Sequence, residues 1–263
     1  MKKLLAGLTL LFLAGTAHAG YITLRTRVDA KTVNNNLQVR VHVTNNGDES
    51  AFNVQAEIQA AGAKILSDKR DELKVNYAYE GTANIPLKLN KPGNYPLVLF
   101  IHYTDANQYP FSALAVRSYA FGREALSPLF GQGTPASFQK EGEIKFRLKN
   151  SADNDVKARI TLVFPRELAS DRPWQAALAR GKTETEIIFK VKNFSALPGS
   201  TYQVFAIAEG EDQAAHYTSI IPATVKVTAG QELFGINYFL IGTALAVLLL
   251  LFFGAEFLSH KKK

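Results

Sequence analysis

Apolar and polar side chains alternate in short runs between residues 20 and 227. One run covers residues 37–43 and another covers residues 52–58, with the turn-forming residues Asn45 to Asp48 between them. Alternation with a period of two is typical of strands with one buried face, and Asn, Gly and Asp favour turns. We therefore expect two consecutive strands that form a hairpin-like pair.

The alternation continues in residues 85–89 and in residues 95–103. The second of these runs is apolar on its other face as well, at Val98 and Phe100. An apolar side chain on both faces is typical of a central strand that is covered on two sides. The first half of the chain thus predicts a series of half-buried strands, one of them central in its sheet.

The second half of the chain repeats this order. Alternating runs return at residues 144–148, 156–164 and 187–191, followed by a second Pro-Gly turn and a tyrosine. The matched residues are Asn45 and Asn150, Pro92 and Pro198, and Tyr95 and Tyr202, which lie 105, 106 and 107 residues apart. A nearly constant spacing predicts a duplicated domain.

The shared order also resembles a known type of domain. The second copy has Phe164-Pro165 at the end of a strand, the lone Trp174, and Leu197-Pro-Gly199 before Tyr202. In this it is similar to the bacterial CARDB and NEW3 (alpha-galactosidase-associated) immunoglobulin-like domains. The resemblance implies a seven-strand antiparallel sandwich with a core from both sheets. It also implies that Trp174 packs into the sandwich edge as a plug.

The predicted fold is therefore all-β, with two tandem immunoglobulin-like sandwiches at residues 20–120 and 138–230. Residues 121–137 lack either period and are rich in Gly and Pro, so we expect a linker there. Its apolar residues are candidates to wedge between the two domains. They are Leu126, Leu129 and Phe130.

Both ends of the chain carry membrane signals. Two lysines, an apolar run and Ala17-His18-Ala19 predict a signal peptide at residues 1–19, cleaved after Ala19. Residues 234–256 contain an apolar stretch long enough to cross a membrane as one helix, and a lysine-rich tail follows at residues 257–263. We expect a type I single-pass cell-membrane protein, with its bulk periplasmic or extracellular and its C-terminus cytoplasmic.

Composition narrows the classes of function. The formal net charge is +7, but the signal and the tail region hold five lysines and Glu256, so the remaining chain has a net charge of +3. Its charges alternate in sign, which argues against nucleic-acid binding. The chain has no cysteine, so it has no disulfide and no thiolate metal site. This composition suits a bacterial envelope protein.

The sequence contains no recognisable catalytic motif, and we expect no enzyme activity, cofactor or metal site. His42 and His216 fall on strands with no expected carboxylate partner, and His102 lies near Asp105. The acidic clusters at 153–155 and 209–212 offer oxygen ligands for calcium, but they stand at turns, where Asp and Asn are favoured for their backbone geometry.

Four residues are candidates for binding a ligand or partner. Trp174 with Arg172 can stack on a sugar or anchor a protein, and Tyr77 with Tyr79 are candidates for an aromatic platform. In the membrane segment, Gly242 and Ala246 lie four residues apart and predict a helix-packing face.

The leading functional hypothesis is a non-catalytic, membrane-anchored scaffold or accessory protein that binds another envelope protein through its immunoglobulin-like domains. The second hypothesis is an envelope carbohydrate-binding module. The third is an accessory subunit of a protein translocation complex, because the order of signal, sandwich, single span and lysine-rich tail resembles the beta subunit of the translocon-associated complex. That family has one sandwich, whereas this chain predicts two.

Overall fold

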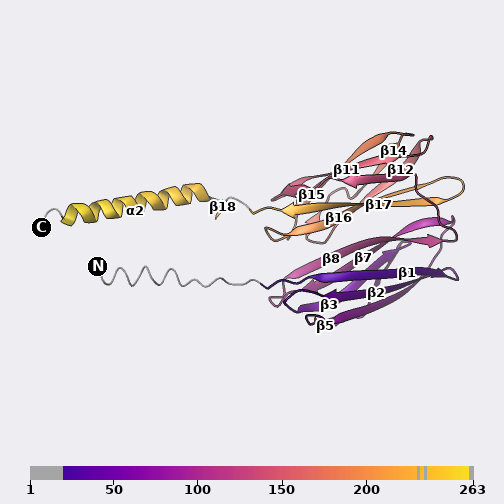
Figure 1. The fold of residues 1–263 in the computed structure, drawn as a ribbon, viewed down its shortest axis with the longest axis horizontal. Coiled ribbons are helices and arrows are strands. Elements are labelled where there is room, and N and C mark those ends of the chain that lie inside the picture. Colours follow the sequence, from indigo (N-terminus) through magenta and orange to yellow (C-terminus); the bar gives the residue numbers. More distant parts are fainter. Residues whose placement is uncertain (1–19, 230–231, 234–235, 261–263) are drawn as a thin grey trace.

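Two β-sandwiches and one helix make up the structure, a computed structural model that describes residues 20–229, 232–233 and 236–260. The predicted signal peptide (1–19) and the last three residues of the predicted tail (261–263) lie outside the described residues. Figure 1 shows the sandwiches side by side, with their strands along the long axis of the molecule and the helix extending away at one end.

The first sandwich contains β1 to β8. One sheet has the order β1–β2–β6, and the facing sheet has the order β8–β7–β3, with β4 and β5 both paired to β3. Leu37 and Val41 of β2 and Ile58 of β3 are fully buried between the sheets, as the alternation predicts. The strands are β1 (Leu24–Val33), β2 (Asn36–Asn45), β3 (Ala51–Ala60), β4 (Ala63–Leu66), β5 (Arg70–Leu73), β6 (Ala78–Pro86), β7 (Gly93–Thr104) and β8 (Pro110–Phe121).

The second sandwich contains β9 to β17. One sheet has the order β13–β15–β11–β9, and the facing sheet has the order β14–β12–β16–β17, with β10 paired to β17. Phe146 and Phe189 meet edge to face in its core. The strands are β9 (Leu129–Gly133), β10 (Ala136–Phe138), β11 (Glu141–Asn150), β12 (Val156–Val163), β13 (Leu168–Ala169), β14 (Trp174–Ala179), β15 (Glu184–Asn193), β16 (Thr201–Glu211) and β17 (His216–Val227).

The predicted linker is wrong from residue 129 onward, because β9 and β10 are strands of the second sandwich. Leu129 is buried in the core of that sandwich rather than wedged between domains, while Leu126 and Phe130 are exposed. Gly131 packs against β11 so closely that a Cβ there would lie 2.3 Å from the carbonyl oxygen of Arg147. Gly131 is therefore required for packing within a strand. Judged by composition alone, a glycine in this stretch indicates a loop.

The expected hairpin of the first two alternating runs is also wrong, because β2 and β3 lie in opposite sheets. The chain crosses between the sheets at Asn45, which is fully buried. Its side-chain amide donates to the carbonyl oxygens of Glu49 (2.7 Å) and Leu73 (3.1 Å), and its Oδ1 accepts from the N–H of Gly47 (3.0 Å). The Asn45 side chain thus supplies hydrogen-bond partners for backbone groups of the turn that have no neighbouring strand to pair with.

Asn150 makes the same corner in the second sandwich. Its amide donates to the carbonyl oxygens of Asn154 (2.8 Å) and Ala179 (2.9 Å), and its Oδ1 accepts from the N–H of Ala152 (2.9 Å). The two asparagines have equivalent partners at equivalent places. The duplication inferred from spacing therefore extends to individual hydrogen bonds.

The sandwiches pack against each other through the outer faces of β7, β8, β16 and β17. A small separate core lies between them, built on Val98, Val116, Phe205 and Ile207. At one end a parallel bridge joins Gly93 to His216. The apolar second face predicted for β7 is therefore covered by the other domain.

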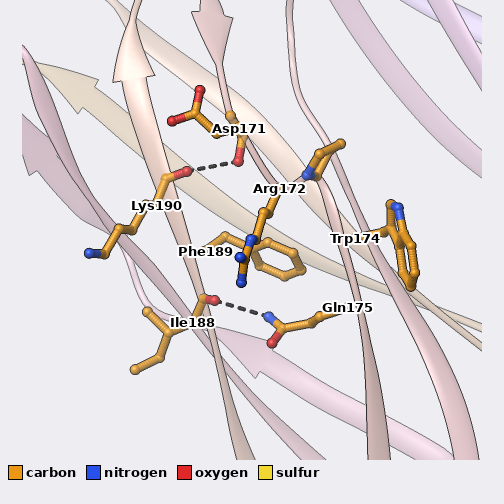
Figure 2. Close-up of a pocket in the computed structure, with 9 residues that line it drawn as sticks. Asp171, Arg172, Trp174, Gln175, Ile188, Phe189 and Lys190 are labelled. Atoms are coloured by element: carbon orange, nitrogen blue, oxygen red, sulfur yellow. Dashed lines mark hydrogen bonds between the residues drawn. The ribbon is translucent and has the colours of Figure 1, made fainter.

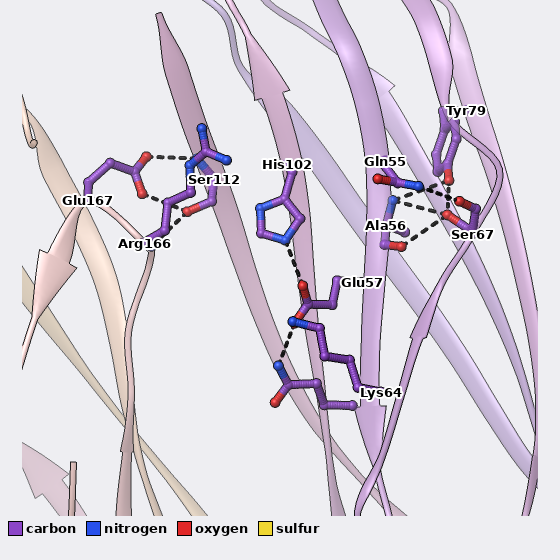
Figure 3. A network of polar contacts seen from close by, with 11 residues as sticks. Gln55, Ala56, Glu57, Lys64, Ser67, Tyr79, His102, Ser112, Arg166 and Glu167 are labelled. Carbon is purple, nitrogen blue, oxygen red and sulfur yellow. Dashed lines mark hydrogen bonds and ion pairs between the residues drawn. The ribbon is translucent and has the colours of Figure 1, made fainter.

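A buried carboxylate fastens another part of this interface. Glu167 of the second sandwich is fully buried and accepts from the N–H (2.7 Å) and the hydroxyl (2.6 Å) of Ser112 on β8. The hydroxyl of Ser112 in turn accepts from the N–H of Arg166 (3.0 Å), as Figure 3 shows. Contacts at separate points along the interface hold the two sandwiches in one relative orientation.

The C-terminal part consists of β18 (Glu232–Leu233), β19 (Ile236–Asn237) and α2 (Tyr238–His260), a helix of 23 residues. Its described side chains, at 239, 240 and 242–252, are exposed. Among the residues that the structure describes, no helix is long and apolar enough to cross a membrane.

Candidate partner-binding edge

Trp174 opens β14, the edge strand of the second sandwich. Its side chain is 51% exposed, so the expectation that it plugs the sandwich edge is wrong. The guanidinium of Arg159, on the neighbouring strand β12, lies 4.5 Å from the centre of the indole ring. This cation–π contact holds the ring on the outer face of the sheet instead of in the core.

A cleft opens between β14 and β15, at the side of the second sandwich. It has a volume of about 730 Å³ and is lined by Arg172, Trp174, Phe189 and Lys190, among others. Figure 2 shows Arg172 over the cleft and Trp174 at its rim. The structure thus places both sequence-predicted residues, Trp174 and Arg172, at one hollow.

Polar side chains cap the β15 side of this cleft. The amide of Gln175 donates to the carbonyl oxygen of Ile188 (3.0 Å), and the hydroxyl of Ser170 donates to that of Lys190 (2.8 Å). These bonds satisfy carbonyl groups that would otherwise be open to a new strand. Two outward carbonyl groups of β15 are therefore already occupied by side chains that precede or belong to β14.

The charges at the cleft are mainly positive. Asp171 is paired with Lys192 at 2.7 Å, and this contact raises the pKa of the Lys192 ammonium. Arg172 and Lys190 form no ion pair with any described residue. The cleft therefore presents two cations beside an exposed aromatic ring, which suits an anionic or acidic ligand.

Tyr77 and Tyr79 do not form the expected aromatic platform. Tyr77 is 59% exposed, but Tyr79 is 3% exposed and lies in the first core. The hydroxyl of Tyr79 accepts from the N–H of Ala56 (3.3 Å), donates to the carbonyl oxygen of Asp68 (2.9 Å) and contacts the hydroxyl of Ser67. Figure 3 shows this cluster beside β3. The second tyrosine is therefore structural.

The histidines have partners that the sequence did not reveal. His42 contacts Glu80, and His216 lies 3.6 Å from Glu209, so the expectation that both lack a carboxylate is wrong. His102 pairs with Glu57 at 3.1 Å rather than with Asp105. Each pair joins residues from neighbouring strands, which alternation alone does not place side by side.

The Glu57 and Glu209 carboxyls have opposite pKa shifts. Burial opposes ionisation of Glu57, but hydrogen bonds from Lys64, Gln59 and His102 outweigh it and lower the pKa. Burial raises the pKa of Glu209, although His216 and Arg159 partly offset it.

The acidic turns act as caps. Asp212 accepts from the N–H groups of Ala214 (2.7 Å) and Ala215 (2.8 Å), which lower its pKa, and Asp155 accepts from the N–H of Gly181 (2.9 Å). Among the described residues, no group of three or more His, Cys, Asp or Glu side chains is placed to hold a metal ion.

Gly242 and Ala246 lie on α2 with exposed positions. A Cβ added at Gly242 would meet no atom within 4 Å. The predicted packing face therefore has room for a neighbouring helix, and its use stays a prediction.

Comparisons with known proteins add little about function. The sequence matches no known family model and no curated protein. Similar solved structures include a cohesin of Acetivibrio cellulolyticus in complex with a dockerin, which has 8% identity and a TM-score of 0.32 and covers 38% of this chain and 99% of its own. A non-cellulosomal cohesin of Archaeoglobus fulgidus has 12% identity and a TM-score of 0.28, and the match covers 41% of this chain and 94% of the cohesin.

The periplasmic chaperone SfaE has 15% identity and a TM-score of 0.32, and the match covers 78% of this chain and all of that one. Likenesses this weak carry no argument about what the chain binds.

Proposed function

We propose that this chain is a non-catalytic, membrane-anchored protein of the cell envelope that binds another envelope protein through its second sandwich. The observation that carries the proposal is the exposed Trp174 beside the cationic cleft. A large aromatic ring with half its surface in water, next to Arg172 and a hollow, has the composition of a binding hot spot.

The packing of the two sandwiches supports this function. The separate core at Val98 and Phe205 and the buried Glu167 join them into one unit. A rigid unit presents the cleft in a fixed orientation, which lowers the entropy lost on binding. The CARDB and NEW3 type of immunoglobulin-like domain remains our proposal for the two sandwiches.

Membrane anchoring through α2 is part of the proposal and rests on the apolar sequence of residues 236–255. The chain has no cysteine, so single cysteines can report its topology. In intact cells, a membrane-impermeant maleimide should label Thr228→Cys and leave Ser259→Cys unlabelled until the membrane is opened. Equal labelling of both positions would refute a single crossing with this orientation.

Co-purification in mild detergent tests partner binding. The full-length chain and Tyr77→Ala should recover the same stoichiometric partner, and Trp174→Ala should lose it. Tyr77 is a matched control because it is an exposed aromatic residue on the other sandwich. The proposal fails if no stoichiometric partner is recovered, or if Trp174→Ala retains it.

Carbohydrate binding is the second candidate, favoured by the same tryptophan beside Arg172. Saturable binding of a cell-envelope polysaccharide that is lost in Trp174→Ala and kept in Tyr77→Ala would place this function first.

A further inference from the structure

The backbone groups of β14 alternate between its neighbour and the outside. The N–H of Leu162 donates to the carbonyl oxygen of Pro173 (2.7 Å), and the antiparallel register continues to Ala158 and Ala177. In such a ladder every second residue bonds to the same neighbour. Gln175 and Ala177 therefore bond to β12, and the backbone N–H and C=O groups of the alternate residues point away from it. The outward residues are Trp174, Ala176 and Leu178.

These outward groups are open to a partner. β14 has only β12 as a neighbouring strand, and within the described part of the chain the backbone of Trp174, Ala176 and Leu178 has no hydrogen-bond partner. Three consecutive outward positions can accept and donate bonds along one side of an added strand.

The equivalent edge of the first sandwich is built differently. Leu73 and Ala179 are equivalent positions, because each accepts a hydrogen bond from the corner asparagine of its own sandwich. The first edge is split into β4 and β5, two strands of four residues each, separated by Ser67 to Lys69. Its strands carry the charges of Lys64, Arg70, Asp71 and Glu72. Short, charged edges disfavour strand addition.

By contrast, β14 has six residues, WQAALA, and none is charged. Its outer face exposes Trp174 and Leu178, which is 48% exposed. Such an edge is a template for another strand. The second sandwich thus leaves open the edge that the first one protects.

Positive charges surround this open edge. Arg172 precedes β14 and Arg180 follows it, and the adjacent β12 places Lys157 and Arg159 on the same surface as Leu178. Two carboxylates also line that surface, but they have basic partners of their own. Glu209 lies 3.6 Å from His216, and Glu211 lies 3.2 Å from Lys91.

We infer that the outer edge of β14 binds an extended segment of a partner protein by strand addition, and that this segment has an apolar centre flanked by acidic residues. The inference deepens the proposed function and rests on it. The added strand bonds to the backbone of Trp174, Ala176 and Leu178. Its apolar side chains lie against Trp174 and Leu178, and its acidic ends face Arg172 and Arg180.

The lone tryptophan makes the inference measurable, because Trp174 is the only one in the chain. The probe is the peptide acetyl-Asp-Glu-Val-Thr-Val-Thr-Val-Glu-Asp-amide, titrated against the full chain in detergent. Binding should shift the tryptophan emission to shorter wavelength. A peptide with Lys in place of each acidic residue should bind at least about tenfold more weakly, since its positive charges are repelled by the arginines.

Two variants at one position test the backbone role. Ala176→Pro removes an outward N–H and leaves the ladder to β12 intact, whereas Ala176→Thr retains the N–H. The proline variant should bind the acidic peptide about tenfold more weakly, and the threonine variant within about twofold of the parent chain. Far-ultraviolet circular dichroism confirms that both variants fold.

Equal binding by the two variants, or no emission change with the acidic peptide, overturns the inference. Peptide-free association of the chain that Ala176→Pro abolishes would identify a second copy as the occupant and overturn the commitment to a different protein. A cellular partner that is lost in Trp174→Ala but kept in Ala176→Pro would leave the proposed function standing and refute strand addition.

Discussion

The two sandwiches share an inner corner and differ at an outer edge. Asn45 and Asn150 are both fully buried and bond to equivalent carbonyl groups, including those of Leu73 and Ala179. Beyond these carbonyls the first edge is short and charged, and the edge formed by β14 is continuous and uncharged. The contacts that make the fold are thus duplicated, while the surface that meets other molecules is specific to one copy.

The corner asparagines should give the largest effect on stability. Asn45→Ala and Asn150→Ala each leave two carbonyl groups and one N–H in a buried turn without a partner, so each should lower the free energy of unfolding by about 3 kcal/mol. Urea denaturation measures this effect. A loss below about 1 kcal/mol in either variant, or a loss in only one, would break the equivalence of the two corners.

Glu167 should come next, because it joins the two copies. Glu167→Ala leaves the N–H and hydroxyl of Ser112 unsatisfied, which should cost about 2 kcal/mol and raise amide exchange in β8 near Ser112. Glu167→Gln retains an acceptor oxygen and should lose less. Unchanged exchange in the alanine variant would show that the apolar contacts alone hold the interface.

The edge of the first sandwich depends on Tyr79. Tyr79→Phe removes a hydroxyl that bonds to Ala56 and Asp68, across the gap between β4 and β5. The loss should be about 1.5 kcal/mol. Trp174→Ala at the open edge should cost less than about 1 kcal/mol, since half of the ring is already in water. Urea denaturation measures both losses. A larger loss of stability in Trp174→Ala than in Tyr79→Phe would contradict a structural role for the first edge and a binding role for β14.

The smallest effect concerns the pH dependence of stability. Burial raises the pKa of Glu209 in the folded state, so the protonated carboxyl favours folding. The stability that this group contributes is fully present below its ordinary pKa of 4.5 and is lost as pH rises through the raised pKa of the folded state. Glu209→Gln should therefore stabilise the chain at pH 7 by up to about 1 kcal/mol. The gain should shrink in denaturation at pH 4, and a constant gain would exclude this cause.

Alternation in the sequence placed most of the long strands, because burial of one face dictates a period of two. It could not assign partners, since the turn after Asn45 has the same composition whether the chain forms a hairpin or crosses between sheets. It also missed β9, where Gly131 replaces an apolar side chain to let two backbones approach. The burial of Tyr79 and the carboxylate partners of His42 and His216 depend on strand pairing, which residue spacing does not encode.

The candidate site was predicted in part. Trp174 and Arg172 stand out in the sequence, and the structure brings them to one cleft. The expected burial of Trp174 is wrong, because the resemblance implied a plug in the sandwich edge. The open edge of β14 was not recognised, although WQAALA between two arginines is a readable signal: a strand without charge, flanked by charge.

Residue-resolved hydrogen exchange of the free chain tests the open edge most directly. The amides of Trp174, Ala176 and Leu178 should exchange at rates close to those of an unfolded peptide, while those of Gln175 and Ala177 should be protected by β12. Uniform protection of all five amides in the monomeric chain would show that the edge is already covered and would refute an open edge at β14.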